Sequence, residues 1–235
     1  MFEELDYQAT AMGELVLQRR RLPAFGERDI YEVKLGDEYL MSSLFVAAEV
    51  ALADRGLALL DGEDWEVVVG GLGLGYTACA ALSHPPLRRL IVVEALAPVI
   101  DWHRRVLVPN GRILNDDPRA DYLNADFFAL ARGPGFDPEQ PGHCFDAILL
   151  DIDHTPTQLL NPAHADLYTE AGMQRLKTML KPGGVFALWS NEAPDPDFLA
   201  LLKRVFEQAE GQSIEFDNPM QGGKARNGLY LAHRS

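Results

Sequence analysis

The sequence is short of cysteine and of positive charge. Its 235 residues include two cysteines, Cys79 and Cys144, which we expect to be small core residues in a reducing compartment rather than a disulfide pair. Lysine and arginine number 21 against 35 aspartates and glutamates, so the net charge is −14. This balance argues against nucleic acid as the main partner, because phosphate binding relies on clustered lysine and arginine.

Long apolar runs, internal repeats and low-complexity tracts are also missing. No apolar stretch approaches the ~20 residues that span a membrane, so we expect no membrane partner. The start of the chain, 1–6, is acidic, the opposite of a secretory signal, and this favours a cytoplasmic protein. A negative surface suits a cationic substrate, but it serves solubility equally well and identifies no substrate.

The composition predicts one substantial core with an appendage, because hydrophobic residues make up 47% of the chain. From about residue 62 onward, apolar runs alternate with helical patterns, which implies right-handed crossovers and a parallel sheet. The expected strands are 66–70, 89–94, 121–124, 146–151 and 185–190. The expected helices are 76–82, 98–106, 127–131, 169–180 and 197–210.

The C-terminal end departs from this alternation. Strands expected at 213–216 and 228–233 have only residues 217–223 between them, so we expect an antiparallel pair. The predicted fold is therefore a doubly wound, Rossmann-like α/β sheet that ends in an antiparallel hairpin. This layout resembles the class I AdoMet-dependent methyltransferase fold rather than that of NAD dehydrogenases.

The N-terminal part has a different pattern. Strands are expected at 14–18 and 30–35, and an amphipathic helix is expected at 42–55. We therefore predict two parts: a small N-terminal β appendage with a helix over 1–60, and the Rossmann-like domain over 61–235.

A glycine-rich turn is the most informative local feature. The run Val67-Val68-Val69-Gly70 leads into Gly71, Gly73 and Gly75, and an alanine-rich helical pattern follows. Glycines let the backbone turn sharply and approach a ligand, and the next helix offers its positive N-terminal end. A nucleoside cofactor is the favoured interpretation, and a tight turn without a ligand is the alternative.

Two acidic residues stand where the next strands end. Glu94 follows the turn at about the 20-residue spacing at which an acid accepts hydrogen bonds from ribose hydroxyls; a solvated strand-end carboxylate is the alternative. Asp126 has two compatible roles, as an acceptor for the adenine amino group or as the N-cap of the helix that follows it.

Chemistry is expected after the fourth strand, at Asp151, Asp153 and His154. The two aspartates share a face if the strand persists, and they would orient an amine nucleophile while His154 acts as a base. A turn built from Asp, Thr and Pro is the alternative. These residues and His164 lack metal-ligand spacing, so we expect no metal.

Two further segments follow strand ends. Residues 189–192 either line an acceptor pocket or form the edge of the core. The loop 153–166 lies where doubly wound folds place their ligands, and we expect it to order when a ligand binds.

Together these motifs resemble the spermidine synthase (polyamine aminopropyltransferase) family over about residues 35–210. The motifs that carry the resemblance are the glycine turn with Thr77, Val93-Glu94, Asp116-Asp117-Pro118-Arg119, Asn124-Ala125-Asp126, 145–151, Leu167-Tyr168-Thr169 and 180–185. The resemblance implies that Gly71, Gly73, Glu94, Asp126 and Asp151 surround an adenosyl-sulfonium ligand or its thioether product. It also implies a homodimer.

The chain departs from the family pattern at three places. The family turn carries an aspartate that holds the aminopropyl ammonium, and Leu74 stands at that position here. The family reads Asp-x-x-Asp-Pro after the fourth strand, whereas here the second position is His154, with Asp153 one residue early. Of the family's N-terminal gate motif, Glu49 matches only the last residue.

These departures favour intact S-adenosylmethionine (AdoMet) as the donor. Its carboxylate would be repelled by an aspartate at position 74, whereas Leu74 leaves backbone N–H groups of the turn free to receive it. The leading hypothesis is therefore methyl transfer from AdoMet to a small, amine-bearing or other acceptor. Asp151 and Asp153 would orient the acceptor, and His154 would be the base.

Three alternatives stay open. The first is aminopropyl transfer from decarboxylated AdoMet to a diamine, with methylthioadenosine as the product. The second is a non-catalytic nucleoside-binding protein, which the missing family carboxylates also fit. The third is an NAD enzyme, against which the C-terminal hairpin pattern speaks.

Overall fold

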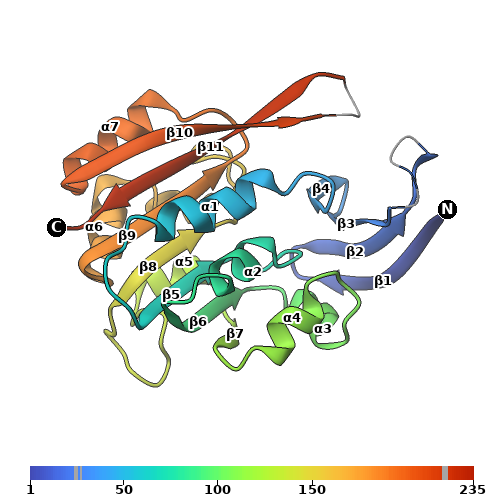
Figure 1. Cartoon of the computed structure of the whole chain (residues 1–235), viewed down its shortest axis with the longest axis horizontal. Helices are drawn as coiled ribbons and strands as arrows, with labels where there is room; N and C mark the ends of the chain where they lie inside the picture. The colour runs from blue at the N-terminus through green and yellow to red at the C-terminus, as the bar shows by residue number, and fades with distance from the viewer. Residues whose placement is uncertain (24–25, 27, 219–221) are drawn as a thin grey trace.

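The computed structural model describes residues 1–23, 26, 28–218 and 222–235, and it contains two sheets (Figure 1). The smaller, antiparallel sheet holds the N-terminal strands in chain order. These strands are β1 (Phe2–Thr10), β2 (Gly13–Arg20), β3 (Ile30–Leu35) and β4 (Glu38–Ser42). The sequence predicted β2 and β3 but not β1 or β4, because these strands are largely exposed and carry no clear apolar alternation.

The larger sheet has seven strands in the order β10-β11-β9-β8-β5-β6-β7. Strands β5 to β9 run parallel, and β11 is antiparallel to both β9 and β10, so the predicted doubly wound fold with a C-terminal hairpin is confirmed. In spatial order the strands are β10 (Gln208–Asp217), β11 (Lys224–His233), β9 (Leu180–Ser190), β8 (Phe145–Leu150), β5 (Trp65–Gly70), β6 (Leu87–Glu94) and β7 (Ala120–Asn124).

Helices cover both faces of this sheet because its central strands are apolar on both sides. Val67 and Val69 face one core, while Val68 faces the other, and all three are fully buried. The first core is completed by α1 (Ala47–Leu57), α2 (Tyr76–Leu82), α3 (Ala97–Arg104) and α4 (Gly111–Asp116). The second is completed by α5 (Phe127–Arg132), α6 (Glu170–Thr178) and α7 (Pro196–Val205).

The N-terminal sheet is attached to the first of these cores. Leu15, Leu17 and Val33 on its inner face belong to the same cluster of buried side chains. The indole N–H of Trp102 on α3 also donates to Asp6 on β1 over 2.7 Å. The predicted division at residue 60 stays a prediction, and α1 packs against α2 and β9 (Figure 1).

The predicted helix 197–210 was too long. Helix α7 ends at Val205, and β10 begins at Gln208, which pairs with His233 of β11. Pairing with β11 therefore overrides the helix propensity of Gln208, Ala209 and Glu210. The hairpin is also longer than predicted, and part of its expected connection, 219–221, lies outside the described residues.

Two negative findings concern the described part of the chain. No helix there is long and apolar enough to cross a membrane. Cys79 and Cys144 are both free thiols, and burial raises the pKa of Cys79 to about 12.

Candidate functional site

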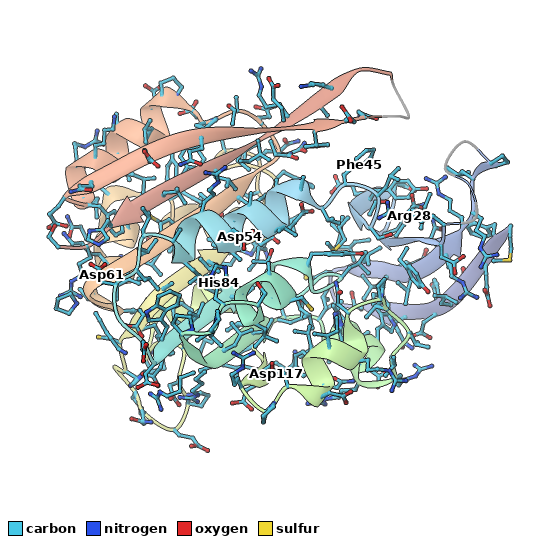
Figure 2. The ribbon with its side chains drawn as sticks, in the orientation of Figure 1. Arg28, Phe45, Asp54, Asp61, His84 and Asp117 are labelled. Carbon is cyan, nitrogen blue, oxygen red and sulfur yellow. The ribbon has the colours of Figure 1, made fainter. Side chains whose placement is uncertain are left out.

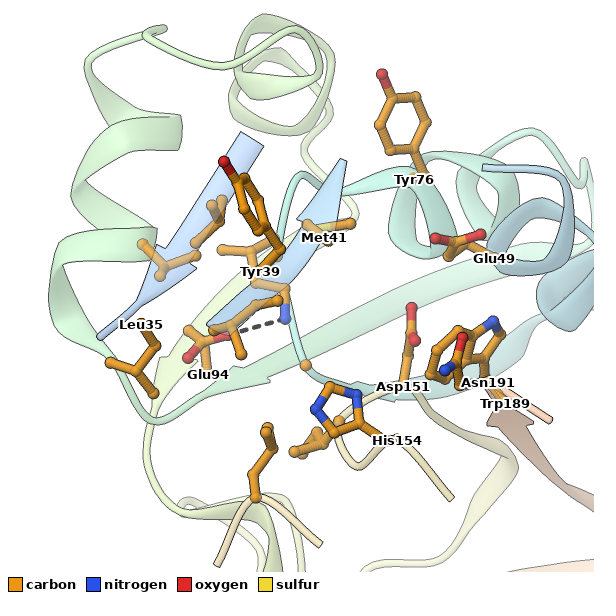
Figure 3. A pocket seen from close by; sticks show the side chains of 18 of the residues that line it. Leu35, Tyr39, Met41, Glu49, Tyr76, Glu94, Asp151, His154, Trp189 and Asn191 are labelled. Atoms are coloured by element: carbon orange, nitrogen blue, oxygen red, sulfur yellow. Dashed lines mark hydrogen bonds between the residues drawn. The ribbon is translucent and has the colours of Figure 1, made fainter. Parts of the chain in front are cut away.

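A cavity of about 690 Å³ lies at the carboxyl ends of the central strands, where doubly wound folds place their ligands (Figure 3). Its floor is the glycine turn with the ends of β6 and β8. One wall comes from the N-terminal sheet, including Tyr39 and Met41 on β4. The hairpin closes it through Phe216 and Arg226. Phe45, labelled in Figure 2, links these walls, since its ring centroid lies 5.7 Å from that of Phe216.

The glycine turn has the positive φ angles that its glycines permit. Gly71, Gly73 and Gly75 have φ angles of +93°, +48° and +82°, which L residues with side chains rarely adopt. A Cβ atom on Gly71 would lie 2.1 Å from the carbonyl oxygen of Asp151. The turn is thus built for close approach, and ligand contact by Gly71, Gly73 and Gly75 stays a prediction.

Leu74 does not face the cavity, so its predicted role in receiving a donor carboxylate is wrong. Its side chain is fully buried in the first core. Its N–H group points at the Met41 sulfur over 2.8 Å, and the Leu72 N–H donates to Glu94 over 3.0 Å. The Gly71 and Gly75 N–H groups are bonded to backbone carbonyls. The N–H groups of residues 71, 72, 74 and 75 are therefore engaged within the protein, which removes the basis for preferring intact AdoMet.

Glu94 stands at the end of β6 and lines the cavity. Its two oxygens accept the N–H groups of Leu72 and Leu96 over 3.0 and 2.8 Å, and the first bond is drawn in Figure 3. Burial raises the pKa of Glu94, while the surrounding backbone N–H groups lower it. The carboxylate is thus oriented by the turn itself, and its contact with ribose stays a prediction.

Asp126 is the N-cap of α5, as one of its two expected roles required. Its Oδ1 accepts the N–H groups of Phe128 and Ala129 over 2.8 and 3.1 Å. The side chain also lines the cavity, and Oδ2 has no hydrogen-bond partner within the described residues. The second oxygen is therefore available to a ligand, and the adenine role stays a prediction.

Asp151 and Glu49 point toward the same part of the cavity (Figure 3). Asp151 accepts the Thr77 hydroxyl over 2.7 Å, and burial raises its pKa to about 6. Glu49 on α1 is 8% exposed, and burial together with the charge of Asp151 raises its pKa to about 8. No local pattern in the sequence predicts a chemical role for Glu49, because nothing along the chain shows that α1 reaches the ends of the strands.

Asp153 lies elsewhere than predicted. Strand β8 ends at Leu150, so Asp151 and Asp153 do not share a strand face. Asp153 is 1% exposed, and it accepts hydrogen bonds from Tyr168, Leu160 and His164, each over 2.8 Å. It does not line the cavity, so in this structure it cannot orient an acceptor directly.

The two histidines of this segment do line the cavity. His154 lies at its edge with Nε2 3.8 Å from Glu38 on β4. His164 is held by Asp153, and its ring stacks on Phe128 with centroids 3.6 Å apart. Within the described residues no group of three or more His, Cys, Asp or Glu side chains is placed to hold a metal.

Residues 189–192, at the end of β9, were expected either to line an acceptor pocket or to form the edge of the core, and the structure shows some of each. Trp189 and Asn191 line the cavity, whereas Ser190 is buried away from it. The indole N–H of Trp189 is buried without a partner in the part of the chain that the structure describes.

The cavity is markedly acidic. Among the described residues that line it, Glu49, Glu94, Asp126 and Asp151 are acids, and Arg226 is the one arginine or lysine. A cation inside such a cavity is stabilised, because charges ~4 Å apart interact by about 4 kcal/mol at an effective dielectric constant of 20.

The sheet order and the glycine turn followed by a strand-end acid define the class I AdoMet-dependent methyltransferase fold. Solved structures agree. A spermidine synthase in complex with the transition state analogue AdoDATO matches with a TM-score of 0.73 and 19% identity, over 99% of this chain and 74% of that one. Spermidine synthase from Thermotoga maritima matches with a TM-score of 0.70 and 17% identity, over 99% of this chain and 72% of the other.

Sequence relatives confirm the resemblance to the polyamine aminopropyltransferases over part of their length. Polyamine aminopropyltransferase 2 of Pseudomonas aeruginosa is 29% identical over 157 residues, which cover 62% of this chain and 41% of the relative. Polyamine aminopropyltransferase of Nitrosomonas europaea is 33% identical over 134 residues, 56% of this chain and 37% of the relative. The matches thus span less than half the length of these relatives. No family model matches the chain.

Proposed function

We propose that this protein transfers an aminopropyl group from decarboxylated AdoMet to an amine. Both named sequence relatives are polyamine aminopropyltransferases, and both named structural relatives are spermidine synthases. These comparisons favour the alternative of the sequence analysis over its leading hypothesis. Methyl transfer finds no support among them.

The observation that carries this proposal is the charge of the cavity. Decarboxylated AdoMet has a sulfonium and an ammonium and no carboxylate, and a diamine acceptor is also cationic. Four acids line the cavity beside one arginine of the described chain, and acids still outnumber it when Glu49, with a pKa of about 8, is protonated at neutral pH. The N–H groups of residues 71, 72, 74 and 75, which a donor carboxylate could use, are already engaged within the protein. A dicationic donor therefore fits the site better than intact AdoMet does.

The proposed reaction is an in-line displacement at the carbon next to sulfur. The sulfonium is already a good leaving group, so the protein mainly positions the amine and excludes water. Glu94 would hold the ribose, Asp126 would hold the adenine, and Gly71 and Gly73 would contact the donor. His154, at the edge of the cavity, remains a candidate base for the amine.

Calorimetric titration with decarboxylated AdoMet, AdoMet and methylthioadenosine tests the donor. We expect decarboxylated AdoMet to bind about tenfold or more tightly than AdoMet. The ligated protein is then mixed with putrescine, and mass spectrometry follows methylthioadenosine and the aminopropylated product. Tighter binding of AdoMet would overturn the proposal and restore methyl transfer.

A variant of Glu94 checks that binding occurs in this cavity. Glu94→Gln should weaken all three nucleoside ligands about tenfold, because it removes a charged acceptor for the ribose hydroxyls. Asp121→Asn is the matched control, since it removes one charge from an exposed position on β7. Binding of none of the three ligands by the wild-type protein would overturn the proposal and the nucleoside-binding alternative together.

A further inference from the structure

Thr77 carries a buried hydroxyl group that the proposed function does not use. The residue lies in the first turn of α2, directly after the glycine turn, and it is 3% exposed. Its hydroxyl group is therefore shielded from water, and a buried hydroxyl normally has a partner within the protein. That partner is Oδ2 of Asp151, 74 residues further along the chain, over 2.7 Å.

The hydroxyl proton of Thr77 has two acceptors within reach and can serve only one of them. The Asp151 carboxylate lies 2.7 Å from the hydroxyl oxygen, whereas the carbonyl oxygen of Glu49 on α1 lies 3.4 Å away. A hydrogen bond donated to an ionised group is shorter and about twice as strong as one between neutral groups, so the proton points to Asp151. The hydroxyl therefore favours the ionised form of this acid.

The backbone of Asp151 is already fixed by the glycine turn. Its N–H group donates to the Gly70 carbonyl oxygen over 2.8 Å, and a Cβ atom on Gly71 would lie 2.1 Å from the Asp151 carbonyl oxygen. Rotation of the carboxylate about the side-chain bonds is the freedom that remains, and the bond from Thr77 restricts it. Among the described residues Oδ1 of Asp151 has no hydrogen-bond partner, so this oxygen is available to a ligand in the cavity.

The other titratable groups near Asp151 do not replace this bond. Glu49 on α1 points toward the same part of the cavity, Tyr76 stands on α2, and His154 follows β8 (Figure 3). None of these side chains donates a hydrogen bond to the Asp151 carboxylate within the described chain. Burial raises the pKa of Asp151 to about 6, and the hydrogen bond from Thr77 counteracts this rise.

We propose that Thr77 is a positioning residue, whose hydroxyl holds the Asp151 carboxylate ionised and leaves Oδ1 turned toward the amine that attacks the donor. This inference rests on the proposed function, because it gives Asp151 the acceptor-orienting role that its place at the strand end predicts. An ionised carboxylate accepts an N–H group of the amine. A protonated one would instead donate to the amine lone pair, which must attack the carbon next to sulfur. No covalent bond changes at Thr77.

The diagnostic variant is Thr77→Val, which keeps the shape of the side chain and removes the hydroxyl. With decarboxylated AdoMet and putrescine at pH 7 we expect kcat to fall about tenfold, because the carboxylate is less ionised and free to turn. KM for decarboxylated AdoMet should change less than about twofold, because Thr77 does not line the cavity. Thr77→Ser keeps the hydroxyl, and its kcat should stay within about threefold of the wild type.

Titration of the Asp151 carboxyl group measures the same bond without any substrate. Carbon-13 NMR of protein labelled at its aspartate carboxyl groups follows the titration, and Asp151→Asn identifies the signal. In Thr77→Val the pKa of Asp151 should rise by about 1, because a donor to the ionised form is lost, and the acid limb of the kcat profile should move with it. Thr77→Ser should leave both at their wild-type positions.

Thr178→Val is the matched control on the far side of the sheet. Thr178 is exposed at the end of α6, and its hydroxyl donates to the Arg175 carbonyl oxygen over 2.7 Å. The substitution makes the same chemical change away from the cavity, so kcat and the Asp151 titration should match the wild type. Thermal unfolding checks that every variant is folded at the assay temperature.

The outcomes separate the role of Thr77 from the proposed function. If Thr77→Val changed neither the Asp151 titration nor kcat, the role of Thr77 would be overturned and the transferase proposal would stand. A raised pKa with an unchanged kcat would also overturn it, since the reaction would not depend on the bond. A lower kcat with an unchanged titration and no rescue by Thr77→Ser would reduce Thr77 to packing. Absence of aminopropyl transfer by the wild type would overturn both proposals.

Discussion

The sulfur of Met41 lies 2.8 Å from the amide nitrogen of Leu74, so a strand of the N-terminal sheet rests directly on the glycine turn. This contact joins the two sheets at the cavity. It also uses the N–H group that the sequence analysis assigned to a donor carboxylate. The N-terminal sheet therefore helps determine which charges the turn presents to a ligand.

The contact between Met41 and the turn leaves no room for a side chain at position 73. A Cβ atom there would lie 2.3 Å from the Met41 sulfur, and φ at Gly73 is +48°. We expect Gly73→Ala to lower the free energy of unfolding by about 2 kcal/mol, from backbone strain and from displacement of Met41. Urea denaturation monitored by fluorescence measures the loss.

Gly36→Ala separates these two causes. Gly36 has φ +57°, and no atom of the described residues lies within 4 Å of the added Cβ, so this variant carries only the backbone strain, about 1 kcal/mol. Equal losses for the two variants would show that the Met41 contact contributes nothing.

Asp153 is expected to hold the loop 153–166 rather than to contact substrate. Asp153→Asn keeps the shape of the side chain but disturbs the bonds from His164, Tyr168 and Leu160. We expect a loss of about 2–4 kcal/mol in the free energy of unfolding and faster proteolysis of the loop. Asp101→Asn, at a half-exposed surface pair, should cost less than about 0.5 kcal/mol. A normal loop with lost turnover would restore a direct catalytic role.

Glu49 should make stability fall as pH rises. Its pKa is about 8 in the folded protein against an ordinary value of 4.5, so between these values the folded state binds more protons than the unfolded state. Asp151, with a pKa of about 6, acts in the same direction at lower pH. We expect Glu49→Gln to gain about 4 kcal/mol over the wild type at pH 8 and little at pH 4.5. Thermal unfolding across this range checks it, and a pH-independent difference would contradict it.

The two roles of Asp126 are separable by substitution. Asp126→Ser keeps a side-chain cap for α5 but shortens the reach into the cavity, so stability should change by less than about 0.5 kcal/mol. Asp126→Ala should cost about 1 kcal/mol because the cap is lost. If Asp126 holds adenine, both variants weaken methylthioadenosine binding about tenfold in calorimetry. Normal binding by Asp126→Ser would reduce Asp126 to its capping role.

The parts of the fold that follow from local pattern were predicted well. Helix α2 and strand β3 have the predicted bounds, since buried apolar runs and glycine punctuation are properties of short segments. Strand β1, by contrast, depends on pairing with β2, and Gln208–Glu210 depend on pairing with β11. In both cases the pairing makes the segment a strand, and the residue pattern of the segment itself carries no strand signal.

The amino-acid sequence by itself determined the doubly wound fold, the glycine turn and the acids at the ends of β6 and β8. The reason is that apolar periodicity and the glycines between elements are properties of short segments. Tertiary structure alone decided which side chains face the cavity. It turned Leu74 and Asp153 into the interior and carried Glu49, on a helix that precedes the main sheet in the chain, to a place facing Asp151. Which side chains face the cavity depends on how the loops pass over the strand ends and on how α1 packs. No spacing of residues along the chain predicts this.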